Sequence, residues 1–261
     1  MRCEVLTLFP EMVQAAAAHS IMKRAQEKGL FSVHVHNLRD YTEDPHRTAD
    51  DTPYGGGGGM IMKAEPIFRA VEKLQQQLGT LRIIMPSPQG IRFSQGLAQE
   101  LSQESDPLVF LCGHYEGIDE RVRTGLSIEE ISLGDYVVTG GELPALIMMD
   151  AAMRLIPGVV GDPHSIEQES FMEPLLDFPH FTRPFELRGH AVPEILLSGN
   201  HEAIRRWRRK ESIRNTLLKR PDLLQTEVMK QEDQQLLEEI TQEYGSTYSA
   251  SPKPRKEGVP S

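Results

Sequence analysis

Residues 107–144 constrain this chain more than any other stretch, because two apolar runs there end in glycines. The first run ends at Gly113, and a second short run, 136–138, is bracketed by Gly134 and by the pair Gly140–Gly141. Glycines at strand ends let the backbone turn sharply and approach a ligand closely, because they carry no Cβ. Their spacing matches neither the dinucleotide fingerprint nor the phosphate-binding loop. The pattern indicates a main-chain pocket for a small ligand without a polyphosphate, and the glycine turns of an ordinary α/β domain explain it equally well.

Strand-like and helix-like patterns alternate along the first part of the chain. The expected strands cover residues 3–8, 31–36, 81–86 and 107–112, and the expected helices cover 10–28, 66–78, 94–104 and 143–156. A polar segment from residue 39 to 59 ends in consecutive glycines and is expected to be a functional loop. The alternation predicts an α/β fold with a mainly parallel sheet and helices on both faces.

Composition changes after this region. Residues 157–171 contain prolines and glycines that break regular structure, which is typical of a linker. Beyond them the strand pattern ends, and short helices are expected near 200–212, 212–219 and 230–243. We predict a catalytic α/β domain over 1–160, an interdomain linker over 161–171, a small all-α C-terminal domain over 172–244 and a disordered tail over 245–261.

The overall composition, 39% hydrophobic and 25% charged, is that of a globular protein. No apolar run is long enough to span a membrane, and no signal-peptide pattern opens the sequence, so we expect a cytoplasmic protein. Cys3 and Cys112 are the only cysteines, a number that excludes a disulfide framework. Both lie in apolar runs and are expected to be buried thiols.

Charge is distributed unevenly. The net charge is −10, yet residues 204–220 hold eight Lys or Arg and one Glu, and this segment also contains the single tryptophan. Acidic residues dominate directly afterwards, over 222–243. A basic cluster with a tryptophan inside it is a reasonable phosphate-binding face for a nucleic acid. A solvated helix face is the alternative.

Several sequence motifs resemble those of the bacterial tRNA (guanine-37-N1)-methyltransferases. They are PYGGGGGM at 53–60, SPQG at 87–90, CGHYEGIDERV at 112–122, SLGDYVVTGGELPA at 132–145 and LSGNHEAIRRWR at 197–208. They occur in the family's order and spacing, and the similarity covers nearly the whole chain. The resemblance implies a methyltransferase with a C-terminal trefoil knot in its α/β domain, S-adenosylmethionine as cofactor, and methylation of N1 of the tRNA guanosine just 3′ of the anticodon. The knot rests wholly on the resemblance.

The resemblance also implies the cofactor pocket. Its residues would be Pro86, Ser87, Gly90, Gly113, Tyr115, Glu116, Leu133, Gly134, Asp135, Tyr136, Val137, Val138, Gly140, Gly141 and Pro144. Backbone amides of such loops can bind the adenine edge and the methionine end of the cofactor, so few charged side chains are needed.

The reaction itself requires a base and a cation. N1 of guanine must lose its proton as it attacks the methyl group, which calls for a nearby carboxylate or imidazole. Negative charge then develops at O6, which calls for a cation. By resemblance Arg154 supplies the cation and Glu169 the base, although the family usually has Asp at the second position. Without the resemblance, Glu169 would be interpreted as a solvent-exposed charge of the linker. Arg154 would be interpreted as the polar end of a helix.

Further residues are expected to hold the tRNA. By resemblance Arg47 and Asp50 belong to a loop that closes over the target nucleoside, and the residues that grip the anticodon arm are His180, Arg183, Arg205, Arg206 and Arg208. No metal-binding motif stands out. His34 and His36 share one face of a strand and are expected to face solvent. The family is associated with Mg2+, which Glu116 or Glu169 could bind through hard oxygen atoms.

The helix expected at 143–156 is apolar on almost every side, which predicts burial round most of its circumference. A homodimer whose active sites combine residues of both subunits, as the resemblance implies, would explain this. Two rival interpretations remain at this stage. One is a related knotted methyltransferase acting on another RNA, and the other is a non-catalytic protein that binds the anticodon arm.

Overall fold

The computed structural model describes residues 1–161, 166, 169–224 and 229–245. The chain forms two compact units, Met1–Pro163 and His164–Ser261. The predicted disordered tail lies outside the described residues except for Gly245, and so does much of the predicted linker.

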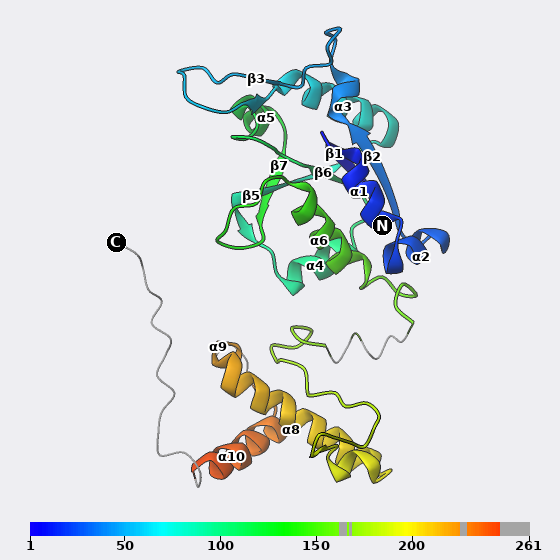
Figure 1. Ribbon diagram of the computed structural model, residues 1–261, viewed down its shortest axis with the longest axis vertical. Helices are drawn as coiled ribbons and strands as arrows, with labels where there is room; N and C mark the ends of the chain where they lie inside the picture. The colour runs from blue at the N-terminus through cyan, green and yellow to red at the C-terminus, as the bar shows by residue number, and fades with distance from the viewer. Residues whose placement is uncertain (162–165, 167–168, 225–228, 246–261) are drawn as a thin grey trace. The chain divides into compact units, whose positions relative to one another are not determined.

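The first unit alternates strands and helices (Figure 1). In chain order it contains β1 (Arg2–Thr7), α1 (Pro10–Ala17), α2 (Ser20–Glu27), β2 (Ser32–Asn37), the 3-10 helix η1 (Leu38–Tyr41), β3 (Asp50–Asp51), β4 (Ile61–Met62), α3 (Ala64–Leu78), β5 (Arg82–Arg92), α4 (Gln95–Ser102), β6 (Leu108–Leu111), α5 (Glu120–Gly125), β7 (Ile128–Ser132) and α6 (Glu142–Met153). The main sheet has five strands in the order β2-β1-β6-β5-β7, and every neighbouring pair is parallel. The prediction of an α/β fold with a mainly parallel sheet is therefore confirmed.

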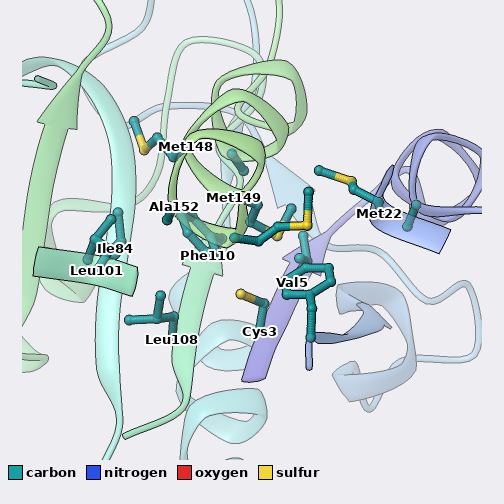
Figure 2. Packing of buried hydrophobic residues seen from close by; sticks show 14 of the residues in the cluster. Cys3, Val5, Met22, Ile84, Leu101, Leu108, Phe110, Met148, Met149 and Ala152 are labelled. Carbon is teal, nitrogen blue, oxygen red and sulfur yellow. The ribbon is translucent and has the colours of Figure 1, made fainter. Parts of the chain in front are cut away.

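Helices cover both faces of this sheet. On one face, side chains of α1, α2, α4 and α6 pack with Val5, Ile84 and Phe110 (Figure 2). On the other face, α3 and α5 pack with Leu6 and Val109. Successive strand residues point to opposite faces, so each central strand supplies both cores. Such two-sided burial explains why these strands are continuous apolar runs in the sequence.

The helix expected at 10–28 is in fact two helices, α1 and α2. Val13 and Ala17 are the buried residues of α1, and a continuous helix would bury positions near 20–21 and 24 next. The residues buried in α2 are instead Met22 and Ala25. The interruption shifts the apolar face by about one residue, so both helices contact the same core.

Two elements, α5 and β7, were not expected from the sequence, because their segment is polar. In β7, Glu129 is half-buried, and its carboxylate accepts hydrogen bonds from Arg82 of β5 at 2.9 and 2.8 Å. An ion pair across the sheet thus adds to the apolar contacts of Ile128 and Ile131, which pack with the two cores. Strand β5 is also longer than expected, since it continues to Arg92 through a register shift between Pro86 and Ile91.

The second unit contains the β8 (Glu186–Leu187) and β9 (His190–Ala191) hairpin, the 3-10 helix η2 (Glu194–Leu197), and helices α8 (His201–Lys219), α9 (Pro221–Leu224) and α10 (Gln231–Gly245). Its small core is formed by Leu175, Ile213, Leu236 and Ile240. The hairpin was not expected. The helices expected at 200–212 and 212–219 are the continuous helix α8.

Candidate active site

A cavity of about 300 Å³ opens in the first unit beside the middle of β5 and at the carboxyl ends of β6 and β7. In parallel sheets, the segments that leave these strand ends are free to surround a ligand. The walls are the middle of β5 (85–89), where its register with β7 shifts, the turn after β6 (113–118) and the segment from the end of β7 to the start of α6 (131–144).

The structure brings the residues predicted for the cofactor together, with two exceptions. Those that line the cavity are Pro86, Ser87, Gly113, Tyr115, Glu116, Leu133, Gly134, Tyr136, Val137, Val138, Gly140, Gly141 and Pro144. Gly90 and Asp135 do not line it. Lining residues that the sequence did not single out include Gln89, His114, Arg123 and Thr139. The sequence signal that could have identified His114 is its place within the motif CGHYEGIDERV.

Two glycines are explained by close packing of the backbone. A Cβ on Gly141 would lie 2.7 Å from Cys112 Cα and 2.9 Å from the amide nitrogen of Gly113. The amide of Gly141 donates a 2.9 Å hydrogen bond to the carbonyl of Gly113, so the start of α6 lies directly against the turn after β6. A Cβ on Gly90 would overlap the backbone of Glu130 in β7. Gly90 therefore serves the contact of β5 with β7 rather than the lining.

A buried polar network lies behind the cavity wall. The Glu142 carboxylate is 1% exposed, and its Oε2 lies 2.6 Å from Nε2 of His114. Its Oε1 accepts a hydrogen bond from the hydroxyl of Thr7, and that hydroxyl accepts one from the amide of Phe9 at 2.8 Å. Glu142 lies in the first turn of α6, where the helix dipole favours a negative charge. The network joins the end of β1, the turn after β6 and the start of α6.

The glycine-rich loop contacts one edge of the cavity. The amide of Glu116 donates a 3.1 Å hydrogen bond to the carbonyl of Met60, and a Cβ on Gly59 would overlap the Glu116 side chain. Asp50 forms β3, which pairs with β4 at Met62. Arg47 is exposed, adopts a positive φ of 54° and forms an ion pair with Asp40. The two loop residues predicted to contact the nucleoside are thus placed in the first unit.

The histidine pair of β2 differs from expectation. His34 is exposed, but His36 Nε2 lies 2.6 Å from Glu4 Oε2, and the Glu4 side chain is 1% exposed. Glu4 of β1 is directly opposite His34 in the register, so His36 reaches it along the neighbouring strand. The prediction that both histidines face solvent is wrong for His36, because a buried carboxylate requires a polar partner.

Basic side chains of α8 form ion pairs with acidic side chains of α10 in the second unit. Arg205 pairs with Glu232, and Arg206 pairs with Glu239. Arg208 contacts an aromatic ring instead, with its guanidinium 4.9 Å from the Phe178 ring centroid. His180 is exposed and lies 2.9 Å from Asp177. Arg183 is exposed and precedes a cis proline, Pro184.

Comparison with known proteins matches residues 1–226 to the family model described as tRNA (Guanine-1)-methyltransferase TrmD. A curated tRNA (guanine-N(1)-)-methyltransferase of Dictyoglomus turgidum is 54% identical over 93% of this chain and 98% of its own. The protein of the same name from Brevibacillus brevis is 52% identical over 93% of this chain and 99% of its own. The chain belongs to the tRNA (guanine-1)-methyltransferase family.

Membership of this family makes the protein a methyltransferase. In the first unit, Arg154 follows the last residue of α6, and its amide donates a 3.1 Å hydrogen bond to the carbonyl of Asp150. Glu169 belongs to the second unit, where its side chain lines a cavity together with Phe178 and Arg208. The base and cation expected for a tRNA (guanine-1)-methyltransferase therefore come from different units of the chain.

Other expectations for this family member concern metals, membranes and thiols. Among the described residues, no group of three or more His, Cys, Asp or Glu is arranged to hold a metal ion, so Glu116 and Glu169 are not part of such a group. No helix in that part of the chain is long and apolar enough to cross a membrane. Cys3 and Cys112 are fully buried, as predicted, and burial raises the pKa of both thiols.

Proposed function

We propose that this enzyme methylates N1 of the guanosine at position 37 of tRNA, directly 3′ of the anticodon, with S-adenosylmethionine as the methyl donor. The observation that carries the proposal is the cavity beside β5 and at the carboxyl ends of β6 and β7. Its lining comes largely from the motifs SPQG, CGHYEGIDERV and SLGDYVVTGGELPA, and all of it lies within the range that matches the family. The tRNA substrate implies a cytoplasmic enzyme.

The cavity suits the cofactor chemically. Its volume of about 300 Å³ lies at the lower end of the range for small-molecule sites. Leu133, Val138 and Pro144 offer apolar contacts for an adenine ring. The Glu116 carboxylate in the lining suits a cationic sulfonium group. When bound, S-adenosylmethionine supplies an electrophilic methyl group.

Glu169 and Arg154 would carry out the proton and charge chemistry. Glu169 would accept the proton of N1, and Arg154 would stabilise the negative charge that develops at O6. Arg47 and Asp50 would contact the target nucleoside. His180, Arg183, Arg205, Arg206 and Arg208 would hold the anticodon arm, and there Arg205 and Arg206 would exchange carboxylate partners for phosphates. No step is assigned to Mg2+.

The proposal includes a homodimer and the trefoil knot of the family. In support of the dimer, Leu143 and Ile147 of α6 are about half exposed, and so are Phe9 and Met12 near α1. The apolar character of α6 therefore exceeds what the described chain buries by itself. The knot is proposed from the resemblance to the family alone.

Single-turnover methyl transfer to an unmodified tRNA transcript tests the proposal, with nuclease mapping of the methylated guanosine. We expect N1-methylation at position 37 and none in a transcript with adenosine there. A product at another position, or on ribose, would indicate a knotted methyltransferase with a different target. Tight tRNA binding without any transfer would indicate a non-catalytic binding protein.

Variants of Glu169 test the base. Glu169→Gln keeps the size and hydrogen-bonding capacity but removes the proton acceptor, so the single-turnover rate should fall by roughly 10²–10⁴-fold with little change in tRNA affinity. Glu169→Asp keeps the carboxylate and should retain measurable activity. A Gln variant that reacts at the wild-type rate would exclude Glu169 as the base.

The dimer is tested by complementation. Arg154→Ala and Glu169→Ala should each be nearly inactive alone. If the two side chains act at one site from different subunits, heterodimers of the two variants should regain activity at one of their two sites. Verified heterodimers without any recovery would mean that both residues act from the same chain.

A further inference from the structure

Helix α8 of the second unit has two faces of different character. One face is neutralised by α10, which packs beside it (Figure 1). Besides Arg205 and Arg206, the residues of α8 that pair with acidic side chains of α10 are Arg209, Lys210 and Arg214. The pair of Arg209 with Asp233 is largely buried, since the Asp233 side chain is 3% exposed. The positive charge of this face is therefore largely balanced within the unit.

The other face carries Arg208. An α-helix turns by about 100° per residue, so Arg208 points about 200° away from Arg206 but only about 60° from Arg205 and 100° from Arg209, at the border of the row that faces α10. Arg208 is exposed, and among the residues that the structure describes no carboxylate forms an ion pair with it. Its guanidinium lies over the ring of Phe178, with 4.9 Å between them.

Two pairs of aromatic rings involve this part of α8, one through Phe178, which contacts Arg208, and one through Trp207, the neighbour of Arg208 in the helix. The rings of Phe178 and His180 are 4.5 Å apart, and those of Phe181 and Trp207 are 6.4 Å apart. Phe181 is 48% exposed, although a ring of this size is normally buried. We call the surface formed by Phe178, His180, Phe181, Trp207 and Arg208 the stacking face.

The stacking face borders a hollow. Phe178 and Arg208 line a cavity of about 500 Å³ in the second unit, and the wall of this cavity includes Glu169. The carboxylate proposed as the base and the aromatic side of α8 therefore share one concave surface. A ligand that rests on Phe178 lies at the same cavity as Glu169.

We propose that the stacking face binds unpaired nucleotides of the RNA substrate by base stacking. Single-stranded RNA is recognised mainly by aromatic rings and arginine planes against splayed bases, whereas a duplex offers phosphates and few free base faces. The stacking face offers rings and an arginine that forms no ion pair with a carboxylate among the described residues, whereas the row of α8 that faces α10 has its charge balanced by α10. This inference rests on the proposed function only in taking RNA as the ligand.

The chain offers a direct probe, because Trp207 is its only tryptophan. Titration with an anticodon stem-loop RNA should change Trp207 fluorescence and saturate. A continuous duplex with the same number of phosphates should bind more weakly and change the emission little. Equal responses to the stem-loop and the duplex would mean phosphate contacts without stacking and would overturn the proposal.

Variants separate stacking from charge. Phe178→Leu and Arg208→Ala should each weaken stem-loop binding by roughly 5- to 100-fold, the range typical of losing one stacked base. Phe181→Leu is the variant that avoids folding effects, because this ring already lies at the surface. Lys23→Ala removes one positive charge from the first unit and serves as the control, with unchanged affinity expected. Wild-type affinity for the stem-loop in all variants of the stacking face would refute the proposal of base stacking.

Two further readouts distinguish base stacking from a contact between subunits and from methyl transfer itself. A second copy of the chain could cover the stacking face, and Trp207 emission would then depend on protein concentration without RNA and overturn the proposal. Methyl transfer to tRNA is measured on the same samples. Methyl transfer at position 37 without a change in Trp207 emission would refute base stacking at the stacking face and leave the proposed function intact. Quenching of Trp207 fluorescence by the stem-loop without methyl transfer would contradict the proposed function and leave base stacking intact.

Discussion

Replacing Gly141 by alanine adds one methyl group where the backbone leaves no space for it. The new Cβ would lie 2.7 Å from Cys112 Cα and 2.9 Å from the amide nitrogen of Gly113. Carbon atoms in favourable contact are about 3.5 Å or more apart, so the shortfall to Cys112 Cα is roughly 0.8 Å. The obstructing atoms belong to the backbone and cannot rotate away. The start of α6 must therefore move from the turn after β6.

Two opposing effects determine the change in the free energy of unfolding. Overpacking of a well-packed site destabilises by about 1–3 kcal/mol. Gly141 has φ −78° and ψ −11°, which alanine adopts freely, so the smaller entropy of the unfolded chain returns up to about 1 kcal/mol. The net loss should be about 1–2 kcal/mol, which corresponds to a decrease in Tm of roughly 2–8 °C for a unit of this size.

Gly96→Ala is the matched control, because its Cβ would meet only the Ser94 hydroxyl at 3.8 Å and it lies in helix α4. The same chemical change should there raise stability by about 0.4–1 kcal/mol. Cys3 and Cys112 both belong to the first unit, so their labelling along a urea series reports unfolding of that unit separately. A Gly141→Ala protein as stable as Gly96→Ala would refute the steric argument.

Two other predictions concern buried groups. Cys3 and Cys112 should not react with a thiol reagent in the folded protein and should react fully in urea, because burial raises the pKa of both thiols; labelling at rates near those of a free thiol would contradict this. Burial alone would raise the pKa of Glu4, but hydrogen bonds from His36 and Arg2 outweigh it, and the pKa lies below 4.5. Glu4 should thus stabilise the fold above the ordinary carboxyl pKa and lose this effect as the pH falls through its lowered folded pKa. The difference in unfolding free energy between wild type and Glu4→Gln should therefore shrink as the solution is made acidic. A difference independent of pH would show that the carboxylate charge has no such role.

The sequence alone indicated the α/β class and the main-chain pocket. Apolar runs with turn residues at their ends are local features, and they predicted β6 and the glycine turn that follows it. The motifs around Gly113 and Gly140 also indicated most of the residues that line the cavity. The roles of Arg154 and Glu169 came from the resemblance and remain predictions, because nothing local to either residue marks it as catalytic.

The tertiary structure decided what depends on contacts between distant segments. Thr7 and Glu142 are 135 positions apart, and only the parallel sheet brings β1 and α6 together to form their hydrogen bond. Strand β7 has a polar sequence, and its partner Arg82 lies 47 positions away, so no local pattern could reveal it.

Charge shows the same difference between local pattern and tertiary contact. Composition made residues 204–220 a single basic patch, whereas the fold divides it into a row paired with α10 and a face around Arg208. Composition sums charges along the chain. The electrostatic potential that an RNA meets depends on which carboxylates lie within a few ångströms of each arginine, and that is fixed only when α10 packs beside α8.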